Sequence, residues 1–402
     1  MSDTPLPIDA LIIGGGMAGL FAMHALWNAG HSVCLVERSA LGDGQSVCAQ
    51  GIVHGGVKYS LGGLVSGSAK AIERMPERWL AMADSGAGFD LRGAPPIARS
   101  MWLWRSEGVA GAFAMAGARL SLRARPEAVP PGERPLPLRD VRGDVLRMPE
   151  PVFDPVATLG ALLAPVAPWT VRGEAHASQD GTVRVEGAGR TFALHPRCVV
   201  LAAGAGNASL RGEFGLGQGL MQLRPLHQAM VRGPLPEFNG HCVDGLATRV
   251  TVTSASLAGG DRVWHIGGKL AEEGVSRNAR AQRAHALAEM RAVLPSVDFS
   301  SCIWSTYSVN RAEREQPKGG RPEDACVERS SVGETSVLTV WPTKMALAPV
   351  AADMVLESAG RARHGSSSSA VASALEGWER PAVARAPWRA AREWVPTGEV
   401  GS

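Results

Sequence analysis

The sequence lacks several features that would assign it to a specialised class of protein. None of its apolar runs approaches the roughly 20 residues of a membrane-spanning helix. Its six cysteines form no C-x-x-C pair, which argues against a metal site or a disulfide framework and is typical of a reducing compartment. The formal net charge is only +3, so no strong field indicates a nucleic-acid partner. With no basic region at the N-terminus, we expect a cytoplasmic protein, with at most peripheral contact with a membrane.

Glycine, by contrast, is abundant, and one glycine cluster has a specific context. Residues 10–13 form an apolar run that ends in Gly-Gly-Gly-Met-Ala-Gly at residues 14–19. An apolar segment at residues 20–27 follows, then a second apolar run at residues 33–36 and Glu37. The order of strand, glycine turn, buried helix, strand and acid is typical of a dinucleotide-binding βαβ unit.

Each part of this unit has a physical role. Gly14 permits the tight turn, Gly16 allows a diphosphate to approach the backbone, and Gly19 lets the helix pack on the strand. The N–H groups and the dipole at the helix start attract the diphosphate. Glu37 is placed to accept hydrogen bonds from ribose hydroxyls, and its charge argues against NADP, which has a 2′-phosphate.

A second segment, residues 50–59, narrows the resemblance to one family of proteins. Residues 50–59 read Gln-Gly-Ile-Val-His-Gly-Gly-Val-Lys-Tyr. Together with the glycine turn and Glu37, this segment resembles the D-amino-acid oxidase superfamily of FAD enzymes, and within it the glycerol-3-phosphate dehydrogenases, which have Arg in place of Lys58. The resemblance implies FAD, bound without a covalent link; in some relatives the residue at the position of His54 forms such a link, and this alternative stays open.

Later segments extend the resemblance. Residues 198–207 are similar to the second FAD-contacting strand, and residues 224–231 to the segment that brings His227 to the active site. Residues 305–313 resemble the segment with the substrate-binding Arg311, although Ala312 replaces the usual Pro. Residues 342–349 resemble the turn beneath the flavin pyrimidine ring, although Trp-Pro-Thr stands where glycines usually precede Lys344.

The resemblance implies a set of site residues. The expected catalytic residues are His227, Arg311, Lys344, Lys58 and His54. The expected cofactor-binding residues are Gly14, Gly16, Met17, Ala18, Gly19, Glu37, Arg38, Gln45, Ser46, Gly51, His54, Gly55, Gly56, Ala203, Gly204, Pro342, Thr343, Lys344 and Met345.

The expected fold class is α/β. A Rossmann-like FAD-binding domain of the glutathione-reductase type occupies residues 1–90, 151–217 and 331–360. An interleaved antiparallel-sheet substrate domain occupies residues 91–150 and 218–330, because 402 residues exceed one simple core. We expect a helix at residues 68–84, a strand at residues 190–194 and a separate buried strand that ends in small residues at residues 198–207. The tryptophan-rich tail, residues 361–402, is predicted to be an arm that packs on the body or on another subunit.

Three cations and a histidine predict an anionic substrate. Arg311 offers a planar fork for carboxylate or phosphate, and Lys58 and Lys344 supply point charges. The expected reaction oxidises a small anionic alcohol, such as a polyol phosphate or 2-hydroxy acid, by hydride transfer to flavin N5. His227 is the preferred base because its unperturbed pKa is near neutrality, and His54 is the second choice.

Two other functions remain open at this stage. One is oxidation of an amine or amino acid, because the same Arg serves carboxylates in the amino-acid oxidases. The other is a flavin-binding factor for assembly or RNA modification. The electron acceptor, whether oxygen, a quinone or a carrier protein, is not determined by these residues.

Overall fold

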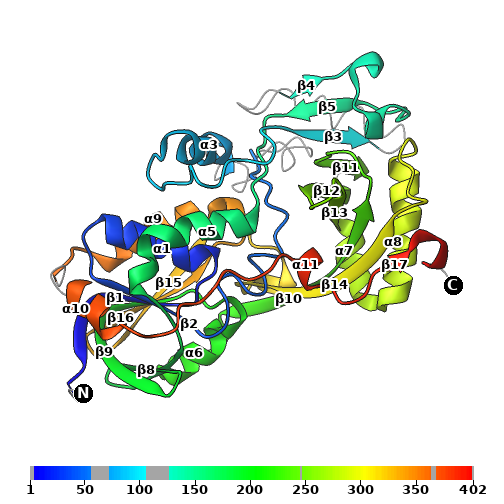
Figure 1. Ribbon diagram of the computed structural model, residues 1–402. Coiled ribbons are helices and arrows are strands. Elements are labelled where there is room, and N and C mark those ends of the chain that lie inside the picture. Colours follow the sequence, from blue (N-terminus) through cyan, green and yellow to red (C-terminus); the bar gives the residue numbers. More distant parts are fainter. Residues whose placement is uncertain (1–3, 56–71, 106–125, 245–246, 364–367, 401–402) are drawn as a thin grey trace.

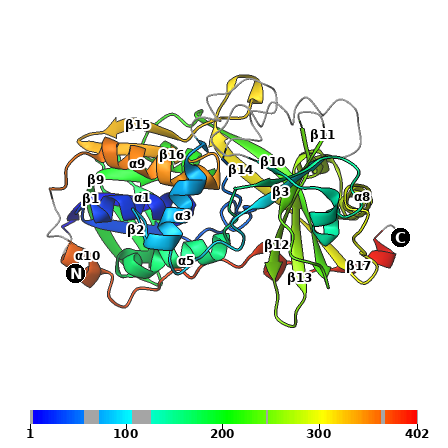
Figure 2. The ribbon, with the colours of Figure 1, turned by 90° about the horizontal axis from the view of Figure 1, so that it is seen from above.

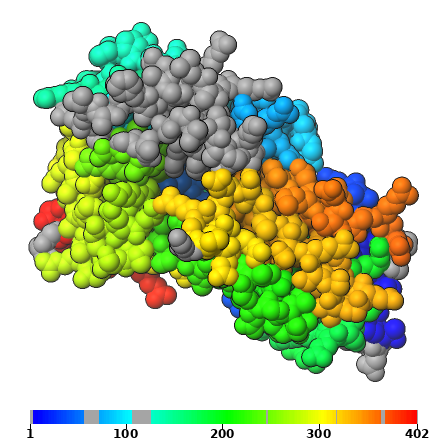
Figure 3. All heavy atoms as spheres, turned by 180° about the vertical axis from the view of Figure 1, so that it is seen from behind, coloured from blue at the N-terminus to red at the C-terminus, as the bar shows by residue number. Residues whose placement is uncertain are grey.

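The computed structural model describes residues 4–55, 72–105, 126–244, 247–363 and 368–400. These residues form two lobes, each built around one sheet, and the lobes lie next to each other in both ribbon views (Figures 1 and 2). The chain crosses between them several times. Seen from behind, the yellow segment, which includes β14 and the loop after it, lies between the lobes (Figure 3).

The sheet of the first lobe has eight strands, in the order β15-β16-β9-β1-β2-β6, with β8 added to β9 and β7 to β8. Its centre is parallel, since β1 pairs with both β2 and β9, and β9 pairs with β16. Parallel strands buried on both faces read as continuous apolar runs, as residues 10–13 do. The strands are β1 (Leu6–Ile13), β2 (Val33–Glu37), β6 (Thr170–Arg172), β7 (Glu174–Ala177), β8 (Val183–Gly187), β9 (Arg190–Leu201), β15 (Cys326–Val332) and β16 (Thr335–Trp341).

Helices cover one face of this sheet and share one apolar core with it. Within this core Trp79 and Phe21 are fully buried, and their rings meet edge to face. The opposite face carries β7 and β8 together with two short helices. The covering helices are α1 (Met17–Asn28), α3 (Met75–Ser85), α5 (Pro155–Val166) and α9 (Ala348–Ala359), and those on the opposite side are α6 (Asn207–Glu213) and α10 (Ser368–Ala374).

The sheet of the second lobe has nine strands, in the order β17-β14-β10-β13-β12-β11-β3-β5-β4. All neighbours are antiparallel except β11 and β3. Its core packs against α8. The elements are β3 (Met101–Arg105), β4 (Glu127–Ala128), β5 (Val145–Met148), β10 (Met221–Gly233), β11 (Gly240–Asp244), β12 (Ala247–Ser256), β13 (Arg262–Gly267), α7 (Lys269–Glu273), α8 (Ala279–Val293), β14 (Ile303–Arg314) and β17 (Val395–Pro396).

The predicted α/β class is confirmed, and two local expectations need correction. The two strands expected around Pro196 are one strand, β9, whose first part pairs with β8 and whose second part pairs with β1. Pro196 lies after Leu194, the last residue that pairs with β8, and before Cys198, the first that pairs with β16, so the strand has one neighbour there and tolerates a residue without an N–H. Of the helix expected at residues 68–84, Ile72 is helical and α3 runs from Met75, next to Pro76, which favours a first turn, while residues 68–71 lie outside the described residues. β15 joins the first sheet, so that sheet begins at Cys326 rather than 331.

The C-terminal segment crosses from one lobe to the other. It runs in red from α10 on the first lobe, through α11 (Pro387–Ala390), to β17 on the second (Figure 1). Trp378 is buried against Phe192 and beneath the guanidinium of Arg190. At the far end Trp304 donates a hydrogen bond to Thr397. The predicted arm therefore packs on the body of its own chain.

None of the described helices is long and apolar enough to cross a membrane. The cytoplasmic location stays a prediction.

The anchoring of the arm gives the first testable prediction. Trp378→Ala should lower the free energy of unfolding by about 3–5 kcal/mol, because it removes a buried indole and leaves a cavity. Leu136→Ala, at a side chain that is 47% exposed, is the control and should change it by less than about 0.5 kcal/mol. Urea unfolding followed by circular dichroism measures both. Equal effects of the two substitutions would contradict a packed arm.

Candidate active site

β1 ends in a glycine turn, and α1 begins directly after it. The backbone segments of the turn and the helix lie so close together that side chains would not fit between them. Gly14 has a φ of 107°, and a Cβ atom on Gly19 would lie 1.9 Å from the carbonyl oxygen of Gly14. The N-cap of α1 is Gly16, so no side chain caps the helix from that position, and the first turn has no acid. The N–H of Met17 donates to the Ser46 hydroxyl at 3.0 Å. This buried helix end can therefore hold a diphosphate.

Glu37, at the end of β2, is tied to the same turn. One carboxylate oxygen accepts the N–H of Gly15 at 2.8 Å, and the other accepts the N–H of Ser39 at 2.9 Å. The oxygen that accepts the Ser39 N–H also accepts the Ser39 hydroxyl at 3.2 Å, so the oxygen bound to Gly15 retains the lone pair that can accept a ribose hydroxyl. Arg38, also expected at the cofactor, is exposed. The acid thus holds the turn in place and borders the expected nucleotide position.

The loop after β2 connects the cofactor half to the second sheet. The side-chain oxygen of Gln45 accepts the N–H of Ala312 in β14 at 2.8 Å. Gly51 has a φ of 72°, and a Cβ atom there would lie 1.8 Å from the carbonyl oxygen of Phe153. Only glycine permits this approach of two backbone segments.

The end of β9 also lacks bulky groups. The N–H of Ala203 donates to the side chain of Asn207 at 2.8 Å, which holds the turn. Gly204 has a φ of 57°, and a Cβ atom there would meet nothing within 4 Å. Parallel strands end at this edge, where open α/β sheets bind their ligands. Gly204 therefore borders open space.

The turn after β16 contains backbone strain. Thr343 has a φ of 64°, in the left-handed region that favours glycine. The N–H of Lys344 donates to Pro342 at 2.6 Å, and the Thr343 hydroxyl donates to the carbonyl of Asp324, also at 2.6 Å. The left-handed position is where the family usually has glycine. In this chain Thr343 takes the left-handed conformation in place of glycine, and the hydrogen bond of its hydroxyl to Asp324 holds it there. Met345 follows in the next short turn.

On β14, Arg311 lies within a group of charged residues. Arg224 makes two hydrogen bonds to the buried carboxylate of Glu313, at 3.1 and 2.8 Å. Glu272 is paired with Arg321. Arg311 itself makes no hydrogen bond or ion pair through its guanidinium with any described residue, and burial followed by repulsion from Arg224 lowers its pKa.

Lys344 is close enough to Arg311 for their charges to repel. Burial is the main cause that lowers the pKa of the Lys344 ammonium group; Asp324, Glu323 and Glu313 oppose this effect, and Arg311 adds to it. The ammonium group donates to the backbone carbonyl of Glu323 at 3.1 Å. The structure therefore brings together two of the predicted cations. Lys58 and Gly56 lie outside the described residues.

The structure does not bring His227 to the face of the sheet that Arg311 occupies. Side chains alternate along a strand, and His227 shares its side with Ala229 and Val231, which pack in the core against α8. Its ring Nδ1 lies 3.0 Å from the carbonyl oxygen of Gly274 and 3.1 Å from that of Arg277. Its role as base stays a prediction that these contacts do not support.

His54 lies at the junction of the lobes, next to two residues that the sequence analysis missed. Its Nδ1 is 3.1 Å from a carboxylate oxygen of Glu150, and the other oxygen of Glu150 accepts the N–H of Gly55 at 2.7 Å. The ring of His241 stacks on that of His54. Glu150 stands between two prolines in an irregular segment, so no periodic pattern marks it.

With this geometry, the comparison with known proteins is direct. The profile of the DAO family, described as FAD dependent oxidoreductase, matches residues 9–339. The chain belongs to this family. It is therefore an FAD-dependent oxidoreductase, and the predicted cofactor and enzyme class are confirmed.

Relatives of this family resemble the chain over most of its length. The sequence is 39% identical, over 87% of this chain and 90% of the relative, to the probable FAD-dependent oxidoreductase PA4991 of Pseudomonas aeruginosa. The crystal structure of that protein covers 98% of this chain and 100% of its own, with a TM-score of 0.79 and 33% identity.

Two more distant structures share the fold. Glycine oxidase from Geobacillus kaustophilus has a TM-score of 0.63 and 18% identity, covering 89% of this chain and 96% of its own. L-alpha-glycerophosphate oxidase from Mycoplasma pneumoniae, with FAD bound, has a TM-score of 0.61 and 16% identity, covering 87% and 94%.

The described residues fit FAD. The helix start at Gly16 has donors for the diphosphate, Glu37 has acceptors for the ribose, and the end of β9 at Gly204 borders open space. Lys344 and the strained turn would supply positive charge and N–H groups to an anionic flavin edge. That FAD binds without a covalent link stays a proposal, as does the set of contact residues.

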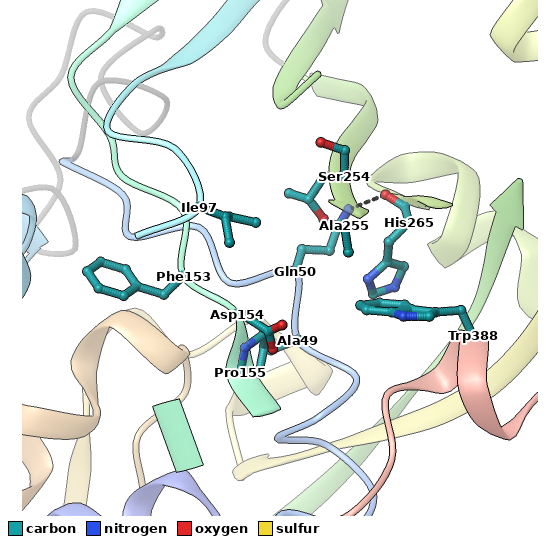
Figure 4. A pocket seen from close by; sticks show the side chains of 11 residues that line it. Ala49, Gln50, Ile97, Phe153, Asp154, Pro155, Ser254, Ala255, His265 and Trp388 are labelled. Carbon is teal, nitrogen blue, oxygen red and sulfur yellow. Dashed lines mark hydrogen bonds between the residues drawn. The ribbon is translucent and has the colours of Figure 1, made fainter. Parts of the chain in front are cut away.

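A small pocket opens at the junction of the lobes (Figure 4). The side-chain amide of Gln50 crosses it and donates to the carbonyls of Thr251 and His265, at 3.1 and 3.0 Å. The ring of His265 is buried between Tyr307, with which its Nε2 shares a hydrogen bond, and Trp388 of the arm. Burial lowers the pKa of His265 to about 3.

The first prediction for the site concerns the glycine turn. Gly19→Ala should yield protein with little bound FAD, because the new Cβ cannot fit beside Gly14 and the helix must move off the strand. Flavin absorbance per mole of purified protein measures this. Gly30→Ala is the control: Gly30 also has a positive φ, but a Cβ there meets nothing within 4 Å. Normal FAD content in Gly19→Ala would contradict the close packing.

The second prediction concerns His265 and pH. Its pKa is 6.5 when unperturbed and about 3 in the folded protein, so the unfolded chain binds the proton first as the pH falls. Stability is therefore lost from pH 6.5 downward, on the order of 2–3 kcal/mol by about pH 4.5 from this group alone. His265→Gln should lose less stability on acidification than the wild type, in urea titrations at the two pH values.

The exposed His195 provides the control for this pH experiment. His195→Gln should retain the wild-type pH dependence. An unchanged acid sensitivity in His265→Gln would show that this ring is not held neutral in the folded protein.

Proposed function

We propose that the enzyme oxidises a small anionic alcohol, such as a polyol phosphate or a 2-hydroxy acid. The observation that supports this most is that the guanidinium of Arg311 makes no hydrogen bond or ion pair with the residues that the structure describes. It is partly buried, and the neighbouring acid Glu313 is already paired with Arg224. A partly buried cation without a partner is costly, and an anionic ligand would relieve that cost.

Arg311 and Lys344 contribute differently to substrate binding. The planar guanidinium can donate two parallel hydrogen bonds to a carboxylate or phosphate, which orients the substrate. The Lys344 ammonium group adds positive charge from the turn after β16. Because two like charges repel at this site, substrate binding should be stronger for a dianion than for a monoanion of the same shape.

FAD, when bound, accepts a hydride from the substrate carbon. The chain must then supply a base for the proton on the substrate oxygen. Between the two histidines considered, His54 has the better support, since its ring lies at the junction of the lobes while the Nδ1 of His227 faces two backbone carbonyls. We propose that His54 is the base that accepts the substrate proton.

Oxidation of an amine is the second candidate. The fork of Arg311 suits an amino-acid carboxylate as well as a hydroxy-acid carboxylate. One structural neighbour is named glycine oxidase and another glycerophosphate oxidase, so the shared fold accommodates both chemistries. The two candidates differ in which compound reduces the flavin.

The test is anaerobic bleaching of the flavin band. Glycerol 3-phosphate, 2-hydroxyglutarate, lactate, glycine, sarcosine and D-alanine would be added separately to the purified protein. Bleaching by a hydroxylated anion supports the alcohol proposal. Bleaching only by glycine, sarcosine or D-alanine supports the amine reading instead.

The role of Arg311 can be tested with the compound that bleaches fastest. Arg311→Ala should weaken its binding roughly 10- to 100-fold, the loss expected for a charge-assisted hydrogen-bond pair. Arg311→Lys should recover part of the loss, because charge is kept and the fork is not. Arg249→Ala is the control, since Arg249 is paired with Glu289 on α8. Unchanged binding in Arg311→Ala would contradict the anion site.

A further inference from the structure

We infer that Glu150 is a positioning residue that holds the ring of His54 in the tautomer able to accept the substrate proton at Nε2. The inference rests on the proposed function for the role of His54 as base. The placement of the two side chains and the state of the ring rest on geometry alone. They can be tested without a known substrate.

The carboxylate of Glu150 is buried and has a small set of partners. It is 1% exposed and follows β5 in the segment that returns to the first lobe. One oxygen accepts the N–H of Gly55 at 2.7 Å, and the other lies 3.1 Å from Nδ1 of His54. It makes no other hydrogen bond to the residues that the structure describes. A buried carboxylate needs such donors, so this pair is a built feature.

The chemistry of this contact decides the state of the ring. An ionised carboxylate only accepts hydrogen bonds, so the Nδ1 atom of His54 must carry the proton that it shares with Glu150. In the neutral ring, Nε2 then carries the lone pair. In many hydrolytic enzymes and metal sites, a carboxylate selects one imidazole tautomer in the same way.

His241 fixes the plane of the ring. The two imidazoles are stacked, with centroids 5.2 Å apart and an angle of 23° between their planes. The Nδ1 of His241 lies 2.8 Å from the hydroxyl of Thr251 on β12, and the ring is 2% exposed. A ring held on one side by Glu150 and on one face by His241 loses little further freedom when a substrate binds.

The proposed step accounts for the proton, the electron pair and the hydride that leave the substrate. The O–H or N–H proton of the substrate moves to Nε2 of His54, and the electron pair it leaves forms the C=O or C=N bond. The hydride that leaves the carbon would go to bound FAD. The positive charge that forms on the imidazole faces the carboxylate of Glu150, which stabilises it.

The three donor atoms of His54, Glu150 and His241 lie within 4.8 Å of one another, which is close enough for a shared metal ion. The hydrogen bonds from His54 and Gly55 already satisfy both oxygens of Glu150. We therefore assign the cluster to proton transfer, and metal content is one outcome of the test.

The decisive variant is Glu150→Gln. Its amide oxygen can still accept the N–H of Gly55, while its NH₂ group must donate to Nδ1 of His54. The proton then moves to Nε2, and the base is lost. We expect flavin reduction at saturating substrate to slow by at least about 100-fold, with substrate affinity changed by less than about twofold. Glu150→Asp, which keeps an acceptor, should recover at least about tenfold of that loss.

The matched control is Asp154→Asn, in the same connecting segment. Asp154 caps α5 by accepting the N–H groups of Val156 and Ala157, and Asn is an equally good cap. This variant should reduce at the wild-type rate. Equal slowing in Asp154→Asn and Glu150→Gln, or equal slowing in Glu150→Asp and Glu150→Gln, would overturn the positioning role.

A second readout needs no substrate. In protein labelled with ¹⁵N-histidine, the His54 resonances, assigned with His54→Asn, should show a protonated Nδ1 in the wild type and a protonated Nε2 in Glu150→Gln, at equal FAD content. The same tautomer in both proteins would overturn the inference, as would a stoichiometric metal ion in the wild type that Glu150→Gln lacks. If the tautomer switches but none of the tested compounds bleaches the flavin, the positioning stands and the proposed substrate class fails.

Discussion

The contact between the glycine turn and α1 is the constraint on which the cofactor half of this protein depends. The backbone of Gly14 and the Cα of Gly19 are so close that no side chain fits between them. This closeness points the first N–H groups of α1 toward the end of the sheet. Glu37 holds the same turn from the neighbouring strand through the N–H of Gly15. A diphosphate site follows because the donors are fixed before any ligand arrives.

A second constraint operates where the two lobes meet. The loop after β2 is joined to the second sheet by backbone contacts of Gln45 and Gln50, and Gly51 is pressed against Phe153. These contacts satisfy polar groups that would otherwise be buried without partners. They also set the position of His54, three residues later. The junction therefore acts as the support of the reactive residues as well as the link between the lobes.

The charges of the site are distributed unequally, and this distribution underlies the proposed specificity. Glu313 is neutralised by Arg224, and Glu272 by Arg321, so the two acids that act on Arg311 are already paired with other cations. In the proposed function, Arg311 and Lys344 are the positive charges that bind the substrate. The buried carboxylate of Glu150, by contrast, meets a histidine rather than an arginine. Anion receptors together with a proton acceptor would suit the proposed oxidation of a carbon that bears OH or NH₂ next to an anionic group.

Local patterns in the sequence were sufficient for the cofactor unit. The glycine turn, its flanking strands and Glu37 lie within 30 residues, so spacing and residue type alone predict their arrangement. The turn at Thr343 was also marked in advance, because a β-branched residue replaces glycine there. Tertiary structure decided the rest. Which face of β10 His227 occupies depends on strand register, and the pairing of Glu150 with His54 joins residues 96 apart in sequence. Such contacts leave no periodic signal, because burial and alternation across the folded sheets create them.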